Sequence, residues 1–119
     1  METGILIRWG APRPGREKDA IDVLQSSIEY FRGLVNDGKL TYFEPFMFGS
    51  GDSEVETGFF ILRGEVTRIF ELLDHQEFRD LLTRGGIVAE HYRLDMLAVG
   101  ESIQRWLGEY EHALTTVGA

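Results

Sequence analysis

The segment Gly10–Arg16 has the glycine spacing of a phosphate-binding loop and stands between a predicted strand and a predicted helix. Pro12 and Pro14 lack the amides that would donate to a phosphate, and Glu17 replaces the hydroxyl residue that would bind magnesium. The segment is therefore predicted to be a rigid turn and not a nucleotide site. Four cations within residues 1–18 leave a small-anion site at this helix start as an alternative.

The three histidines, His75, His91 and His112, do not have the spacing of a metal site. Glu71 precedes His75 by four residues, but Asp74 is expected to break the helix between them and to cap a new helix that begins at Glu77. No Gly-x-Ser-x-Gly turn is present to hold a serine nucleophile, and Ser102 is expected to help start the last helix. The sequence predicts no metal and no cofactor, and it leaves His91, near the start of the last strand, as a candidate for a functional role.

Aromatic residues on the predicted strands form a second candidate group. Alternation along the strands places Trp9, Met47 and Tyr92 on one side of the sheet. Aromatic walls with a few polar tips suit flat organic molecules. We therefore predict that these three residues line a ligand pocket between the sheet and its helices. The alternative is that the aromatic residues only form the core.

Charged residues lie among apolar neighbours on the other side of the predicted sheet. With strand order 4-1-3-2, the residues Asp95, Arg8, Arg63 and Glu44 are expected side by side, as an acid–base–base–acid row. Charges on a buried face need partners, which favours a structural salt-bridge network. The alternative is that Arg8 and Arg63, with His91 nearby, bind an anionic ligand.

Composition limits the class of protein. A chain of 119 residues with 43% hydrophobic and 27% charged residues is expected to form one globular domain over residues 1–119. A net charge of −8 disfavours nucleic acid or an anionic membrane as a partner. The absence of cysteine excludes disulfides and thiolate metal sites. Without a signal-peptide pattern or a long apolar run, the expected location is the cytoplasm.

Hydrophobic periodicity gives the element order β-α-β-β-α-β-α. Strands are predicted at 4–10, 40–48, 58–63 and 90–99, and helices at 16–36, 66–73, 77–83 and 103–114. Pro45 places the second strand at a sheet edge or at a bulge. The Arg84-Gly85-Gly86 segment is expected to end the third helix. A polar loop, holding Ser50 and Ser53, is expected at 49–56.

This order, the aromatic hairpin and the bent helix with sequence LLDHQEFRDLL resemble the dimeric α+β barrel superfamily over residues 4–100. The resemblance implies an α+β, ferredoxin-like antiparallel sheet of order 4-1-3-2 that dimerises through its faces. That superfamily holds cofactor-independent monooxygenases, haem-degrading enzymes, lactone isomerases, stress-response proteins and ligand-sensing regulatory domains. No catalytic motif of a subfamily matches this sequence, so no catalytic residue is carried over.

Both sides of the predicted sheet are apolar, but two crossover helices can cover only one side. A second copy of the sheet is the expected cover for the other side, which predicts a homodimer. The apolar stripe Ile103, Trp106, Leu107, Tyr110 and Leu114 predicts that the C-terminal helix docks.

Mainly through this resemblance, together with the aromatic group on the strands, we expect a domain that binds, with or without transforming, a small and partly apolar organic molecule. A non-catalytic structural or protein-interaction dimer is the alternative, and a ligand-sensing regulatory domain is a third hypothesis.

Overall fold

The computed structural model describes residues 1–49 and 55–117 and consists of a four-stranded antiparallel sheet with four helices. The elements are β1 (Glu2–Trp9), α1 (Glu17–Asn36), β2 (Tyr42–Met47), β3 (Gly58–Glu65), α2 (Val66–Leu73), α3 (Gln76–Val88), β4 (Arg93–Ala98) and α4 (Glu101–Thr116). Most of the expected polar loop at 49–56, with Ser50 and Ser53, falls on residues 50–54, outside the described residues.

The strands lie in the order β2-β3-β1-β4, which is the predicted order 4-1-3-2 read from the other edge. All pairs are antiparallel. Pro45 lies in β2, at the sheet edge, because its missing amide cannot donate to a ladder on both sides. The β2–β3 ladder runs without interruption from Tyr42–Arg63 to Met47–Gly58, so the edge position alone accommodates the proline.

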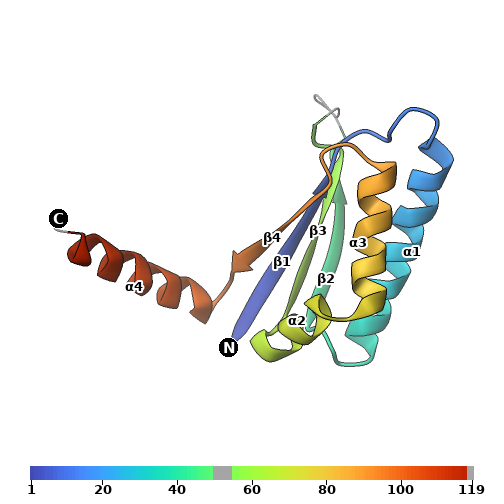
Figure 1. Cartoon of the computed structure of the whole chain (residues 1–119). Helices are drawn as coiled ribbons and strands as arrows, with labels where there is room; N and C mark the ends of the chain where they lie inside the picture. Colours follow the sequence, from blue (N-terminus) through green and yellow to red (C-terminus); the bar gives the residue numbers. More distant parts are fainter. Residues whose placement is uncertain (50–54, 118–119) are drawn as a thin grey trace.

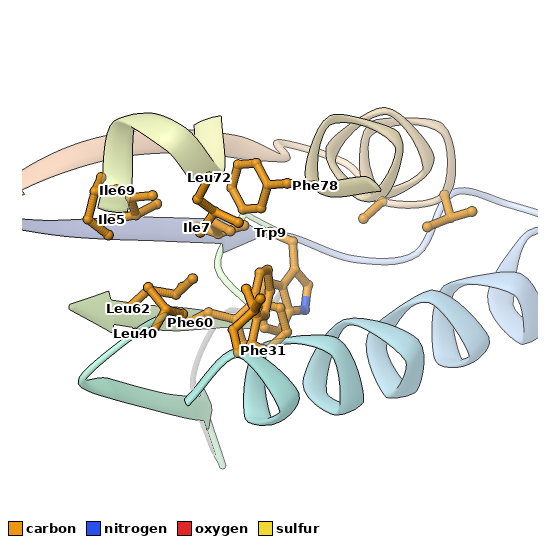
Figure 2. Packing of buried hydrophobic residues seen from close by; sticks show 13 residues of the cluster. Ile5, Ile7, Trp9, Phe31, Leu40, Phe60, Leu62, Ile69, Leu72 and Phe78 are labelled. Carbon is orange, nitrogen blue, oxygen red and sulfur yellow. The ribbon is translucent and has the colours of Figure 1, made fainter. Parts of the chain in front are cut away.

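One face of the sheet packs against the helices and forms the core, as Figure 2 shows. Ile5 and Ile7 of β1 point into it, and alternation along β3 adds Phe60 and Leu62. Phe31 of α1 packs edge-on against Phe60, with 5.6 Å between ring centroids, and it also contacts the ring of Phe78 in α3. The predicted alternation of strand residues between two faces is confirmed by this packing.

Two local predictions are wrong, one at each end of α3. The bend at Asp74 is present, but Asp74 does not cap α3: the capping position is His75, and it makes no side-chain cap hydrogen bond. The helix also continues through Gly85 and Gly86 to Val88. The reason is tertiary, because the Tyr92 ring occupies the space where a Gly85 side chain would lie.

The opposite face of the sheet, which we call the open face, is covered by none of the described helices. Figure 1 shows α1 and α3 on one side of the sheet and α4 projecting away from them. The radius of gyration is 16.4 Å, whereas a compact chain of this length has about 13.5 Å. The prediction that the C-terminal helix docks on its own domain is therefore wrong for the single chain.

The start of α4 is nevertheless anchored to the end of β4. Ser102 is buried, and its Oγ donates to the Val99 carbonyl at 2.7 Å and accepts from the Val99 amide at 2.6 Å. Gly100 has a φ of +54°, a conformation that side chains other than glycine rarely adopt. The predicted role of Ser102 in starting the last helix is thus confirmed.

Candidate functional site

A pocket of about 120 Å³ lies between the sheet and helices α1 and α3. Its walls come from three places: the ends of the strands, the inner side of α1 and the end of α3. The strands supply Trp9, Met47 and Phe60, α1 supplies Ala20, Val23, Leu24 and Ser27, and the α3 end with the following turn supplies Gly85, Val88, Ala89 and Tyr92. No charged side chain lines the pocket in the described part of the chain.

The three residues that the sequence assigned to one pocket, Trp9, Met47 and Tyr92, line this pocket together. Trp9 is buried, and its indole packs on Phe60 with 4.6 Å between ring centroids. Met47, at 62% exposure, lies at the rim, where Ile21 is also exposed. The pocket therefore has an aromatic wall inside and exposed apolar side chains, one of them the flexible Met47, at its entrance.

Tyr92 is the titratable residue among the described residues that line the pocket. Its hydroxyl forms no hydrogen bond among the described residues. Burial raises the pKa of Tyr92 well above its ordinary value, because the phenolate would lose its hydration. The hydroxyl is therefore a neutral donor at physiological pH, available to an acceptor atom of a ligand.

Helical residues that the sequence analysis did not assign to a site form half of the pocket. Ala20 and Ser27 lie on the side of α1 that faces the sheet, and Gly85 lies at the corresponding place on α3. Small residues on the buried side of a helix leave space where leucine or phenylalanine would fill the core. These residues are far apart in the sequence and form no pattern, so no signal in the sequence marks them.

A short second ladder closes one end of the pocket. Pro12 bridges to Ala89, and Gly10 donates its amide to the Glu90 carbonyl at 2.7 Å. Arg13 reaches across with its side chain to the Gly86 carbonyl and to the Glu90 carboxylate, both at 3.2 Å. The predicted rigid turn is thus the end wall of the pocket, and its arginine is paired with protein groups.

The open face carries a network of charged side chains. Arg8 donates to Asp95 Oδ2 at 2.6 Å and lies 3.9 Å from Glu56, which also pairs with Arg93. Arg63 donates to Glu2 Oε1 at 3.1 Å. The Nε atoms of both Arg8 and Arg63 are buried and have no hydrogen-bond partner among the described residues.

The predicted row Asp95, Arg8, Arg63, Glu44 is corrected by the register. All four residues lie on the open face, but they occupy three rows of the ladder. Glu44 and Asp95 share the row of Leu6, whereas Arg63 pairs with Gly4. Arg8 is four residues from Gly4, so the two arginines are offset by about 13 Å along the strands. Glu44 bonds to the hydroxyl of Tyr42 in place of Arg63.

The histidines are exposed and apart from one another. His75 lies 3.9 Å from Glu77 at the start of α3, and the break at Asp74 separates it from Glu71. His91 has a φ of +55°, in the turn before β4, and its carbonyl accepts from Arg93. No group of three metal-ligating side chains occurs among residues 1–49 and 55–117. None of the described helices is long and apolar enough to cross a membrane.

The chain matches no family model, and no curated protein sequence matches it. Several solved structures are similar to it, including the following two. The protein Rv0793 from Mycobacterium tuberculosis has a TM-score of 0.64 and 16% identity, over 85% of this chain and 97% of that one. A dimeric protein of unknown function and ferredoxin-like fold from Bacteroides fragilis has a TM-score of 0.59 and 10% identity, over 80% of this chain and 93% of that one. The predicted ferredoxin-like α+β fold is confirmed.

Proposed function

We propose that this protein is a homodimer in which each subunit binds one small, uncharged, largely apolar organic molecule in the pocket between sheet and helices. The main observation in support of this proposal is the pocket, which is lined by Trp9, Met47 and Tyr92 and by no charged side chain among the described residues. Apolar pockets with a few convergent polar groups are the usual form of small-molecule sites.

The size and lining of the pocket suggest the ligand chemistry. A volume of about 120 Å³ suits a single six-membered ring, since an engineered apolar cavity of roughly 150 Å³ binds benzene. The Tyr92 hydroxyl favours a ligand with one acceptor, such as a carbonyl or ether oxygen. A carboxylate ligand is disfavoured, because the described walls offer no cation to compensate its lost hydration.

Dimerisation is supported by the open face. Its strand positions include the apolar residues Leu6, Phe46, Phe59, Ile61 and Leu97, and no described helix covers them. A two-fold related copy would cover this surface with an identical one. The similar protein from Bacteroides fragilis is dimeric, which agrees with this proposal.

Ligand binding is tested by the melting temperature in the presence of toluene, cyclohexanone and cyclohexanecarboxylate. We expect the first two to raise the melting temperature, with cyclohexanone above toluene, and the carboxylate to leave it unchanged. In a Trp106→Phe variant the remaining Trp9 should also change its emission on binding. Equal responses to all three probes, or none to any, would contradict the proposal.

A pair of variants on α1 locates the binding. Ala20→Leu places extra atoms in the pocket, whereas Ser26→Leu adds a similar group on the exposed side of the same helix. The first variant should abolish the ligand-induced shift and the second should retain it. Retention of the shift in Ala20→Leu would place binding elsewhere.

A structural or protein-interaction dimer is the second candidate. It is favoured by the charged side chains of the open face, because Arg8 and Arg63 already have carboxylate partners within the chain. Such a network suits a contact between subunits better than an anion-binding site. A dimer that responds to none of the probes would select this candidate.

A further inference from the structure

We infer that α4 is an arm that packs its apolar stripe on a second copy of this chain. The stripe consists of Ile103, Trp106, Leu107, Tyr110 and Leu114, which recur at helical spacing on one side of α4. This inference rests on the dimer proposed above, and it adds α4 to the contact between subunits.

The stripe has no cover within its own chain. All five side chains are between 44% and 65% exposed, and α4 contacts mainly the ends of β4 and β1. An isolated helix of 16 residues is only marginally stable in water, because most helical stability in proteins comes from packing an apolar side. A formed α4 therefore requires a surface to pack against.

The joint between β4 and α4 directs the helix away from the core of its own chain. Gly100, with its positive φ, turns the chain, and the buried Ser102 fixes the turn through both backbone groups of Val99. The direction of α4 is set by these contacts, and Figure 1 shows that it leads away from α1 and α3. The surface that covers the stripe must therefore belong to another molecule.

The stripe is continuous with the open face, which identifies that molecule. The Val99 side chain lies over Gly4 on the open face, next to Leu97, and Gly100 lies beside the Arg63 guanidinium. The apolar surface thus runs from β4 directly into α4. A second copy seated on the open face by a two-fold axis meets α4, and its own α4 meets the first subunit in the same way.

Two matched pairs of substitutions test the arm. Trp106→Glu with Leu107→Glu places two carboxylates in the stripe, and Gly108→Glu with His112→Glu places two on the other side of α4. Light scattering and sedimentation over a concentration series would measure mass and dimer dissociation constant. We expect at least a tenfold rise in the dissociation constant for the stripe variant and less than a twofold change for the control.

A third variant separates this inference from the dimer itself. Ile61→Glu lies in the middle of the open face and should also dissociate the dimer. If Ile61→Glu dissociates the dimer and the stripe variant does not, the dimer stands and the arm is wrong. If the wild type is a monomer, both are wrong, and binding of that monomer to zwitterionic phosphatidylcholine vesicles would assign the stripe to a membrane surface. Near-ultraviolet circular dichroism would confirm that each variant is folded.

Discussion

The ring of Tyr92 packs directly on the backbone of α3 at Gly85, where any side chain would overlap it. This contact joins the turn before β4 to the end of α3, and both residues line the pocket. Gly86, the next residue, has open space around the position of a Cβ. A side chain is therefore excluded at Gly85 and can be accommodated at Gly86.

Gly85→Ala should therefore destabilise the protein by about 1–3 kcal/mol, because the new methyl group displaces the Tyr92 ring. Gly86→Ala should stabilise it by about 0.5–1 kcal/mol, since alanine is favoured over glycine inside a helix. Urea denaturation of the two variants measures both free energies of unfolding. Equal effects of the two substitutions would contradict the packing described for Tyr92.

Alkaline pH should destabilise the fold through Tyr92. Burial raises its pKa, so between pH 10 and the folded pKa the unfolded chain loses a proton that the folded chain retains. Stability is fully present below about pH 10 and falls above it, by up to about 1.4 kcal/mol per pH unit for one such group.

The variant Tyr92→Phe should reduce this fall. Tyr30, whose pKa is raised by burial, and Tyr42, whose pKa is raised by its hydrogen bond to Glu44, contribute to the part of the fall that remains. Urea midpoints of the wild type and of Tyr92→Phe at pH 8 and pH 11 test the prediction. The difference between the two proteins at pH 8 gives the effect of removing the hydroxyl, and it is subtracted from the difference at pH 11. A parallel loss of stability in the two proteins would show that Tyr92 does not contribute.

The Arg8–Asp95 pair should contribute more than a surface ion pair. Its side chains are 33% and 49% exposed in the single chain, and the proposed dimer buries them. Arg8→Ala should cost about 3–5 kcal/mol of dimer stability, because it leaves a buried carboxylate without a partner. Arg16→Ala is the control, since the Arg16–Asp19 pair is more than half exposed and should contribute about 0.2–1 kcal/mol. If Arg8 instead binds a ligand, Arg8→Ala would remain a stable dimer and lose a ligand-induced shift in melting temperature.

Replacing Trp9 and replacing Trp106 should lower stability in different ways as the protein concentration changes. Trp9 is buried in the core, so Trp9→Ala should cost about 3–5 kcal/mol at every concentration. Trp106 is exposed in the single chain, so Trp106→Ala should lower the melting temperature only where the dimer forms. Thermal unfolding at micromolar and nanomolar concentration compares them. A concentration-independent loss for Trp106→Ala would place its partner within the same chain.

The faces of the sheet were predictable from the sequence, and the register was not. Alternation has a period of two, so the side of each strand residue follows from its neighbours, as for Trp9, Met47 and Tyr92. The relative shift of two strands depends on the loops that join them, and the pattern contains no information about it. The prediction therefore placed Arg8 and Arg63 correctly on one face and wrongly in one row.

The end of α3 and the position of α4 depend on contacts distant in sequence. Gly85 and Gly86 predict a helix end by their local preference, but Tyr92 requires a glycine inside the helix. The α4 stripe correctly marks an apolar surface, although a pattern along one chain does not specify which molecule covers it. The candidate pocket was found from strand residues only, because small helical residues such as Ala20 leave space and make no pattern of their own.

The position of Pro45 bears on whether these molecules can aggregate. The sheet ends at β2 and β4, and a free strand edge is a template on which strands of other molecules can add without limit. Proline offers no amide to an incoming strand, so the ladder that would propagate a fibril is interrupted at the centre of β2. Pro45 thus protects the β2 edge of the sheet against the addition of further strands.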